Sequence, residues 1–291
     1  MTVKKFAAFA ALTGFLAALA VPALADQPRP WQIWHQTAAS DMMARIEWFD
    51  FYTLWFIVPI TILVMVLLLI VMVRFNRRAN PVASRTSHNS LVEIIWTVVP
   101  IVILVAIAYP SFDLLERQLA PEEEPAMTVK ATGYQWYWGY EYQDEGGLSF
   151  DSIMLREDER ADYGKADKAA YPRLLAVNNE MVVPVDTMVR VLVAGADVLH
   201  SFTVPAFGFK VDAVPGRINE TWFKAEREGL YYGQCSELCG RDHAFMPIAV
   251  RVVSQAQYDA WKTQAENDLE GANAALMAEI ERERAMRVAG N

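Results

Sequence analysis

The chain has 291 residues, enough for one or two domains, and 54% of them are hydrophobic. That fraction is high for a protein that lies entirely in water and indicates that part of the chain resides in a membrane. The net charge of −9 argues against nucleic acid as a partner, because binding to phosphates requires a basic surface, and it suits a basic protein partner.

Residues 1–25 are predicted to form a secretory signal peptide. A pair of lysines gives the basic start, residues 6–19 are apolar, and small alanines precede a predicted cleavage site after Ala25. A retained membrane helix is the alternative, which the short apolar stretch and its small-residue ending disfavour. Residues 26–47 are then the exported N-terminal segment.

Two longer apolar segments, 48–73 and 91–112, are predicted to be transmembrane helices. Each exceeds the ~20 residues needed to cross a bilayer. Pro59 and Pro100 are tolerated in such helices, because neighbouring groups satisfy the freed carbonyls. The connecting loop at 74–90 carries four arginines and no acidic residue, so the positive-inside rule places it in the cytoplasm and the rest of the chain outside.

After a linker at 113–126 that is rich in proline and acidic residues, region 127–254 is predicted to form a series of short strands separated by turns. Residues 188–193 alternate, which places three valines on one face of a strand. Many short strands with such turns are typical of a sandwich or barrel. The charged, alanine-rich tail at 255–291 is predicted to be a solvent-exposed helix, and no function is assigned to it.

A dense aromatic run at 134–142 is also predicted to be a strand. Its period of two places four aromatic side chains on one face, with Tyr137 on the other. The four that share a face are Trp136, Trp138, Tyr140 and Tyr142.

The two cysteines of the chain, Cys235 and Cys239, lie between two strand-like runs, and His243 and Met246 follow them. Thiolate, imidazole and thioether are soft or borderline ligands, a mixture that selects copper. A mononuclear blue-copper site uses one cysteine, so the second thiolate allows two sulfurs to bridge two ions and predicts a dinuclear copper centre for electron transfer. A disulfide is the alternative in an exported region. His200, upstream in the same β-rich region, favours the metal site.

The loop at 229–246 closely resembles the CuA loop of cytochrome c oxidase subunit II. The resemblance includes 134–142, 197–202 and 214–217 and the two apolar segments, so it covers roughly residues 40–255. It implies a two-helix transmembrane hairpin followed by an all-β, cupredoxin-like Greek-key domain, with a C-terminal helical tail beyond the family core.

The ligand chemistry and this resemblance together imply a set of copper ligands. They are two bridging thiolates, two terminal imidazoles and a weak thioether: Cys235 and Cys239, His200 and His243, and Met246. The resemblance alone adds a weak backbone carbonyl, that of Glu237. By resemblance, the thioether shares one ion with His200 and the carbonyl shares the other with His243. The resemblance also implies that the Glu237 carboxylate binds Mg²⁺ or Mn²⁺ at the boundary with the catalytic subunit, for which a hard oxygen is suited. A solvated loop glutamate is the alternative.

Further roles follow from the resemblance. Trp136 is expected to receive electrons from cytochrome c, the alternative being a core aromatic. Glu93 is expected at the mouth of a proton-uptake path, which is compatible with an acid favoured by the dipole at a helix N-terminus. Acids near the aromatic run or the ligands are expected to bind lysines of cytochrome c, the alternative being an ordinary solvated surface. These acids are Glu141, Asp144, Asp151 and Asp197.

The resemblance, together with the ligand chemistry and the predicted membrane helices, therefore implies the electron-transfer subunit of a respiratory terminal oxidase in a bacterial-type inner membrane. It would pass electrons to haem in subunit I, where oxygen is reduced to water with proton pumping, and further oxidase subunits are expected beside it. No CxxCH motif is present, so a fused cytochrome c domain is excluded. A copper chaperone or thiol oxidoreductase would need a βαβ pattern around the cysteines. A quinol oxidase subunit would lack the ligands, and a nitrous oxide reductase would need a large His-rich domain.

Overall fold

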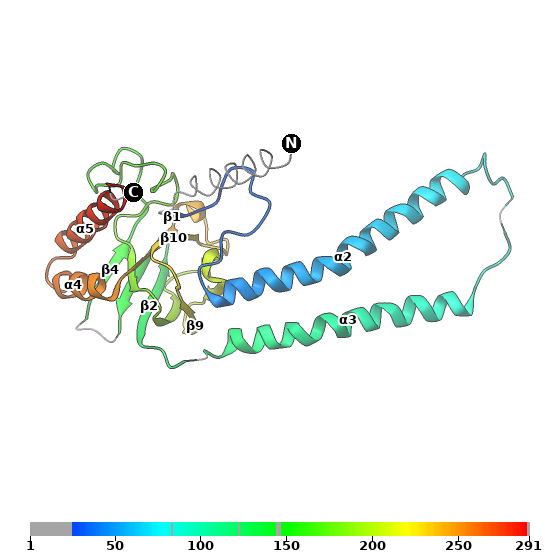
Figure 1. Ribbon diagram of the computed structural model, residues 1–291, viewed down its shortest axis with the longest axis horizontal. Coiled ribbons are helices and arrows are strands. Elements are labelled where there is room, and N and C mark those ends of the chain that lie inside the picture. The colour runs from blue at the N-terminus through cyan, green and yellow to red at the C-terminus, as the bar shows by residue number, and fades with distance from the viewer. Residues whose placement is uncertain (1–24, 83, 122, 144–146, 290–291) are drawn as a thin grey trace, which may run out of the picture.

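The structure is a computed structural model that describes residues 25–289 except 83, 122 and 144–146. Two long helices extend from one end of a β-rich domain, and two shorter helices pack against the opposite side of that domain (Figure 1). The predicted signal peptide, apart from Ala25, lies outside the described residues.

The long helices are α2 (Asp41–Arg74) and α3 (Ser90–Leu119), and both are long and apolar enough to cross a membrane. The Ser40 hydroxyl accepts the Met43 N–H at the start of α2, and the Asn89 side chain accepts two N–H groups at the start of α3. Both helices therefore extend beyond the predicted spans, because apolar patterning marks only the bilayer portion whereas the caps set the ends.

The β-rich domain contains a five-stranded sheet in the order β4-β3-β2-β6-β9, a four-stranded sheet in the order β1-β10-β11-β5, and the hairpin β7-β8. The five-stranded sheet is built from β2 (Met127–Tyr134), β3 (Tyr137–Tyr142), β4 (Ser149–Ser152), β6 (Met188–Gly195) and β9 (Asn219–Lys224). The others are β1 (Ala25–Asp26), β5 (Met181–Pro184), β7 (His200–Val204), β8 (Phe209–Ala213), β10 (Gly229–Gln234) and β11 (Pro247–Val253).

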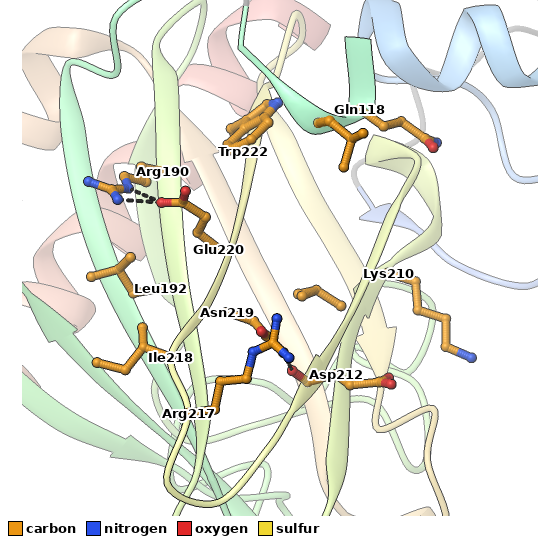
Figure 2. Close-up of a pocket in the computed structure, with 12 residues that line it drawn as sticks. Gln118, Arg190, Leu192, Lys210, Asp212, Arg217, Ile218, Asn219, Glu220 and Trp222 are labelled. Carbon is orange, nitrogen blue, oxygen red and sulfur yellow. Dashed lines mark hydrogen bonds and ion pairs between the residues drawn. The ribbon is translucent and has the colours of Figure 1, made fainter. Parts of the chain in front are cut away.

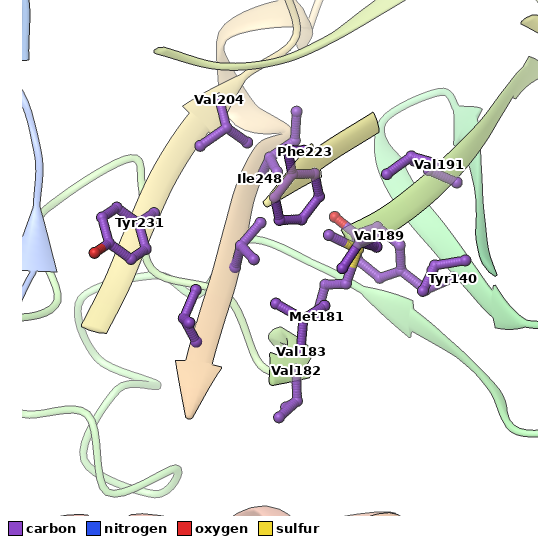
Figure 3. Close-up of a cluster of buried hydrophobic side chains, with 14 of the residues drawn as sticks. Tyr140, Met181, Val182, Val183, Val189, Val191, Val204, Phe223, Tyr231 and Ile248 are labelled. Atoms are coloured by element: carbon purple, nitrogen blue, oxygen red, sulfur yellow. The ribbon is translucent and has the colours of Figure 1, made fainter. Parts of the chain in front are cut away.

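The main core lies between these sheets. Val189, Val191 and Val193 on β6 alternate with half-buried residues and are fully buried, as the sequence predicts. They join Met181 on β5 and Ile248 on β11 in one apolar cluster (Figure 3). Fully burying a side chain of this size contributes roughly 1.5–3 kcal/mol.

The aromatic run departs from the prediction of a single strand. It forms a hairpin in which Tyr134 at the end of β2 pairs with Tyr137 at the start of β3. Trp136 lies in the turn between them, outside both strands, so the period of two does not apply to it, although it packs partly buried against the main core. The period of two applies only within β3 itself.

Strand β11 is buried along its whole length because both of its faces are covered. One face meets the main core, and the other meets a second apolar cluster that includes Leu155, Leu175 and Val177 from the segment before β5. Arg251 is on β11 and is only 5% exposed, so it needs a compensating charge.

That charge is the carboxylate of Glu180, which bridges two buried cations. Its Oε2 is 2.7 Å from Arg251 Nε and its Oε1 is 2.9 Å from Lys165 Nζ. Burial opposes ionisation of Glu180, but the Arg251 and Lys165 charges outweigh it and lower the pKa of this carboxyl to about 2. Arg251 also donates to the Tyr171 hydroxyl at 3.0 Å. The network therefore fastens the segment before β5 onto β11.

The C-terminal tail forms two helices, α4 (Gln255–Ala265) and α5 (Leu269–Ala289), and is not the solvent-exposed helix that the sequence predicts. Trp261 is 2% exposed, and its Nε1 donates to Asn273 Oδ1 at 2.9 Å. Asn273 in turn donates to Asn179 Oδ1 at 3.0 Å. A few apolar residues of α5 at helical spacing, including Ala272 and Leu276, are buried and pack the tail against the domain. In the sequence, the many charged residues around them obscure this pattern.

Candidate metal centre

Two cysteines and two histidines come together at one end of the β-rich domain. Cys235 follows β10, and Cys239 and His243 lie in the loop between β10 and β11. His200 is the first residue of β7. The β10–β11 pairing fixes both ends of the loop, since Gln234 is opposite Pro247 in the register.

The two sulfurs are free thiols, with Cys235 Sγ 3.8 Å from Cys239 Sγ. The alternative of a disulfide therefore does not hold in this structure, because a disulfide requires about 2.05 Å. Both cysteines are buried, at 6% and 4% exposure. A metal–thiolate bond is about 2.3 Å for zinc, so one ion can contact both sulfurs.

The ligand atoms of His200, Cys235 and Cys239 all lie within 4.8 Å of one another. The remaining three predicted ligands each contact one of these sulfurs. His243 Nδ1 and Met246 Sδ are each 3.5 Å from Cys239 Sγ. The Glu237 carbonyl oxygen is 3.3 Å from Cys235 Sγ. The six predicted ligands are thus gathered in one cluster around two buried thiols, and its soft donors suit copper.

The two thiols titrate as a pair. Burial disfavours both thiolates, but contacts from His200 and from backbone N–H groups lower the pKa of Cys235 below its ordinary value. Burial and the neighbouring Cys235 thiolate raise the pKa of Cys239. One thiolate therefore forms readily, and a cation bound between the sulfurs would favour the second.

His200 is held by Asp197, a residue predicted only as a docking acid. Asp197 Oδ1 is 2.9 Å from His200 Nε2, and the same carboxylate accepts the Gln135 N–H at 2.8 Å. Burial lowers the pKa of His200, but its contacts with Cys235 and Asp197 outweigh burial and raise it. With Nε2 facing the carboxylate, Nδ1 faces Cys235 Sγ at 3.9 Å.

Trp136 lies directly against the cysteine loop. Its indole Nε1 donates to the Cys239 carbonyl at 3.2 Å, and Gln135 Nε2 donates to the same oxygen at 3.0 Å. Gly240 has φ +126°, and a Cβ there would lie 3.0 Å from Trp136 Cζ2. A glycine is needed at this position both for the backbone conformation and for the close approach of the indole.

The structure places the other predicted site residues apart from this cluster. Glu93 lies in the first turn of α3, at the end remote from the β-rich domain, and its carboxylate accepts the Asn89 N–H at 3.2 Å (Figure 1). The Glu237 side chain is exposed. Among the predicted docking acids, Glu141 pairs with Lys130 at 2.9 Å, Asp151 is exposed, and Asp144 lies outside the described residues.

A cavity of about 950 Å³ opens between the end of α3 and strands β6, β8 and β9 (Figure 2). Its lining includes Gln118, Lys210, Arg217 and Trp222, and Arg217 comes from the motif at 214–217. None of the six predicted copper ligands lines it.

Comparisons with known proteins match this architecture. The family description "Cytochrome C oxidase subunit II, periplasmic domain" matches residues 127–253, and "Cytochrome C oxidase subunit II, transmembrane domain" matches residues 28–114. The chain is 48% identical over 270 residues to cytochrome c oxidase subunit 2 of Cereibacter sphaeroides, covering 87% of this chain and 88% of that protein.

It is also 48% identical over 237 residues to a probable cytochrome c oxidase subunit 2 of Rickettsia bellii, covering 81% of this chain and 85% of that protein. Among solved structures, the periplasmic domain of subunit II of cytochrome oxidase from Bradyrhizobium japonicum is 53% identical. It covers 50% of this chain and 98% of that domain, with a TM-score of 0.45.

Proposed function

This chain belongs to the cytochrome c oxidase subunit II family, and we propose that it accepts electrons from cytochrome c at a two-copper centre and passes them to haem in subunit I. The convergence of His200, Cys235 and Cys239 within 4.8 Å is the observation that carries this proposal. Two apolar helices anchor the chain in the membrane.

The residues of the cluster fit two copper ions. Cys235 and Cys239 would bridge them, His200 and Met246 would complete one coordination shell, and His243 and the Glu237 carbonyl the other. When bound, the copper pair supplies reversible one-electron transfer. The protein's contribution is a preformed set of donors in which each terminal ligand already contacts a cysteine sulfur.

Trp136 is proposed as the residue through which the electron arrives. When loaded, the copper centre would take up one electron from a ferrous cytochrome, which becomes ferric, and Trp136 would lie on that path. The hydrogen bond from the Trp136 indole to the Cys239 carbonyl supports this role, because it links a partly exposed ring to the backbone of a ligand.

Replacing Trp136 with phenylalanine tests the proposal. The variant keeps an aromatic ring but loses the hydrogen bond to the Cys239 carbonyl. We therefore expect reduction by cytochrome c to slow at least about tenfold in stopped-flow measurements, while the steady-state KM for cytochrome c changes little. Reduction by a small-molecule reductant, which needs no docking site, is the control and should be equal in both proteins. Equal rates with cytochrome c would remove Trp136 from the route.

The partner haem subunit is proposed to dock beside the membrane end of the β-rich domain. The cavity there is lined by Lys210, Arg217 and Trp222 next to Gln118 of the membrane helix α3, within reach of a neighbouring membrane subunit. The exposed Glu237 carboxylate would bind Mg²⁺ or Mn²⁺ at the boundary with that subunit.

The β-rich domain is proposed to lie on the outer, periplasmic side of the inner membrane. The arginines of loop 74–90 support a cytoplasmic loop, and α2 and α3 then return the chain to the outer side. Glu93 would face the cytoplasm at the mouth of a proton-uptake path, while its bond to the Asn89 N–H also stabilises the start of α3.

Asp197 is proposed to orient the His200 ring for copper binding, in addition to any role in docking cytochrome c. In Asp197→Asn the amide keeps an acceptor for Gln135 but loses the charge that favours a proton on His200 Nε2. We expect copper affinity to fall about tenfold to a hundredfold. Copper titration of the apoprotein, followed by its optical spectrum, measures this. Unchanged affinity alongside a weaker response to salt would instead make Asp197 a docking residue only.

A further inference from the structure

Arg241 covers the tryptophan through which the electron is proposed to arrive. Its guanidinium carbon is 5.4 Å from the centroid of the Trp136 ring, within the range of a cation–π contact. The Arg241 side chain is 81% exposed, so this positive charge lies at the surface above the ring.

The guanidinium also pairs with the next residue, Asp242. Arg241 Nη2 is 2.9 Å from a carboxylate oxygen of Asp242, and the conformation of Gly240 sets the direction in which the loop leaves Cys239. Trp136, Asp242 and Phe245 line a hollow of about 300 Å³ beside it. A donor protein that reaches Trp136 through this hollow must therefore contact and desolvate the Arg241–Asp242 pair.

The charge of Arg241 has a consequence for such a donor. A guanidinium stays protonated at all working pH values, and it binds carboxylate or carbonyl oxygens through several N–H donors. A lysine placed against it would be repelled and would compete for Asp242. The acids that could offset this are partly engaged, because Glu141 already pairs with Lys130 and Asp197 with His200.

We propose that Arg241 determines which cytochrome c is accepted. The preferred donor carries a carboxylate or a backbone carbonyl, and not a lysine, at the point of its haem-edge surface that meets Arg241, even where lysines lie further out. This inference rests on the proposed function and names the chemistry of the partner at that site.

The test uses the purified oxidase complex with wild-type chain, Arg241→Gln and Arg241→Lys. Arg156→Gln is the matched control, because Arg156 is also a well-exposed arginine, paired with Glu159 at 2.9 Å. The donors are a lysine-rich cytochrome c and a set of its variants in which one haem-edge lysine at a time is replaced by glutamate. Steady-state KM and kcat are measured at low ionic strength, where screening is weak.

For the lysine-rich donor, Arg241→Gln is expected to lower KM about threefold to tenfold, whereas Arg241→Lys and the Arg156→Gln control stay near wild type. One lysine-to-glutamate donor should bind wild type better than the parent donor does, and that gain should vanish with Arg241→Gln. Replacements at other haem-edge positions should weaken binding equally to both proteins.

The inference is overturned if no donor position couples to Arg241, or if the Arg156→Gln control shifts KM as much. Failure of the proposed function has a different signature. In that case no cytochrome c would reduce the wild-type complex, although a small-molecule reductant still did.

Discussion

Cys235→Ser is expected to abolish formation of the copper pair and, with it, oxidation of cytochrome c, while leaving the β-rich domain folded. Serine is close to cysteine in size, so the buried position after β10 stays filled. Its hydroxyl does not ionise at neutral pH and is a hard donor, so it cannot replace a bridging thiolate for a soft ion.

Copper content per chain measures the loss of the metal centre, and the circular dichroism of the purified protein measures whether the β-rich domain stays folded. Ser236→Ala is the matched control, because Ser236 is exposed and its backbone N–H, which the substitution keeps, donates to the Ser201 carbonyl at 3.0 Å. The control should bind copper like the wild type. Full copper occupancy in Cys235→Ser would show that the thiolate is not a bridging ligand.

Glu180→Gln is expected to be the most destabilising conservative change in the β-rich domain, by about 3–5 kcal/mol. It leaves Arg251 and Lys165 buried, at 5% exposure each, without their shared carboxylate. Burial already lowers the pKa of Lys165 despite Glu180, so removing the carboxylate leaves this ammonium poorly compensated. The loss should appear as a fall of roughly 10 °C in the thermal midpoint of the full chain in detergent.

Glu220→Gln is the control for this prediction. Glu220 pairs with Arg190 across β6 and β9, but both side chains are more than 40% exposed, so this pair is worth about 0–1 kcal/mol. Equal losses in the two variants would mean that the buried network does not hold the segment before β5 against β11.

The same network predicts a pH dependence. The folded-state pKa of Glu180, about 2, lies below the ordinary value for glutamate, about 4.3. Its contribution is therefore fully present above the ordinary value and is lost as the pH falls from there towards 2. Glu180→Gln should lack this part of the acid destabilisation, which an acid titration of both proteins would measure.

The sequence predicts well those features that depend on local pattern. The two membrane helices follow from long apolar runs in the sequence. The burial of the three valines of β6 follows from the strict alternation of residues along that strand. The cysteine loop is local too, because Cys235, Cys239, His243 and Met246 lie within twelve residues and two strands fix the ends of the loop.

Features that depend on distant contacts do not follow from the sequence pattern. Gln135 meets the Cys239 carbonyl across 104 positions of sequence, and Arg251 meets Glu180 across 71, so no periodicity can reveal either. The strand period does not apply to Trp136, because the run that contains it turns back as a hairpin. The composition of the tail predicts an exposed helix because its charges outnumber the few apolar residues that pack against the domain.

Electron paramagnetic resonance of the copper-loaded oxidase complex tests the central claim most directly. We predict hyperfine structure from one unpaired electron shared equally by two copper ions, lost in Cys235→Ser and retained in Ser236→Ala. A spectrum from a single copper, or no copper signal with Cys235 and Cys239 joined as a disulfide, would contradict the account.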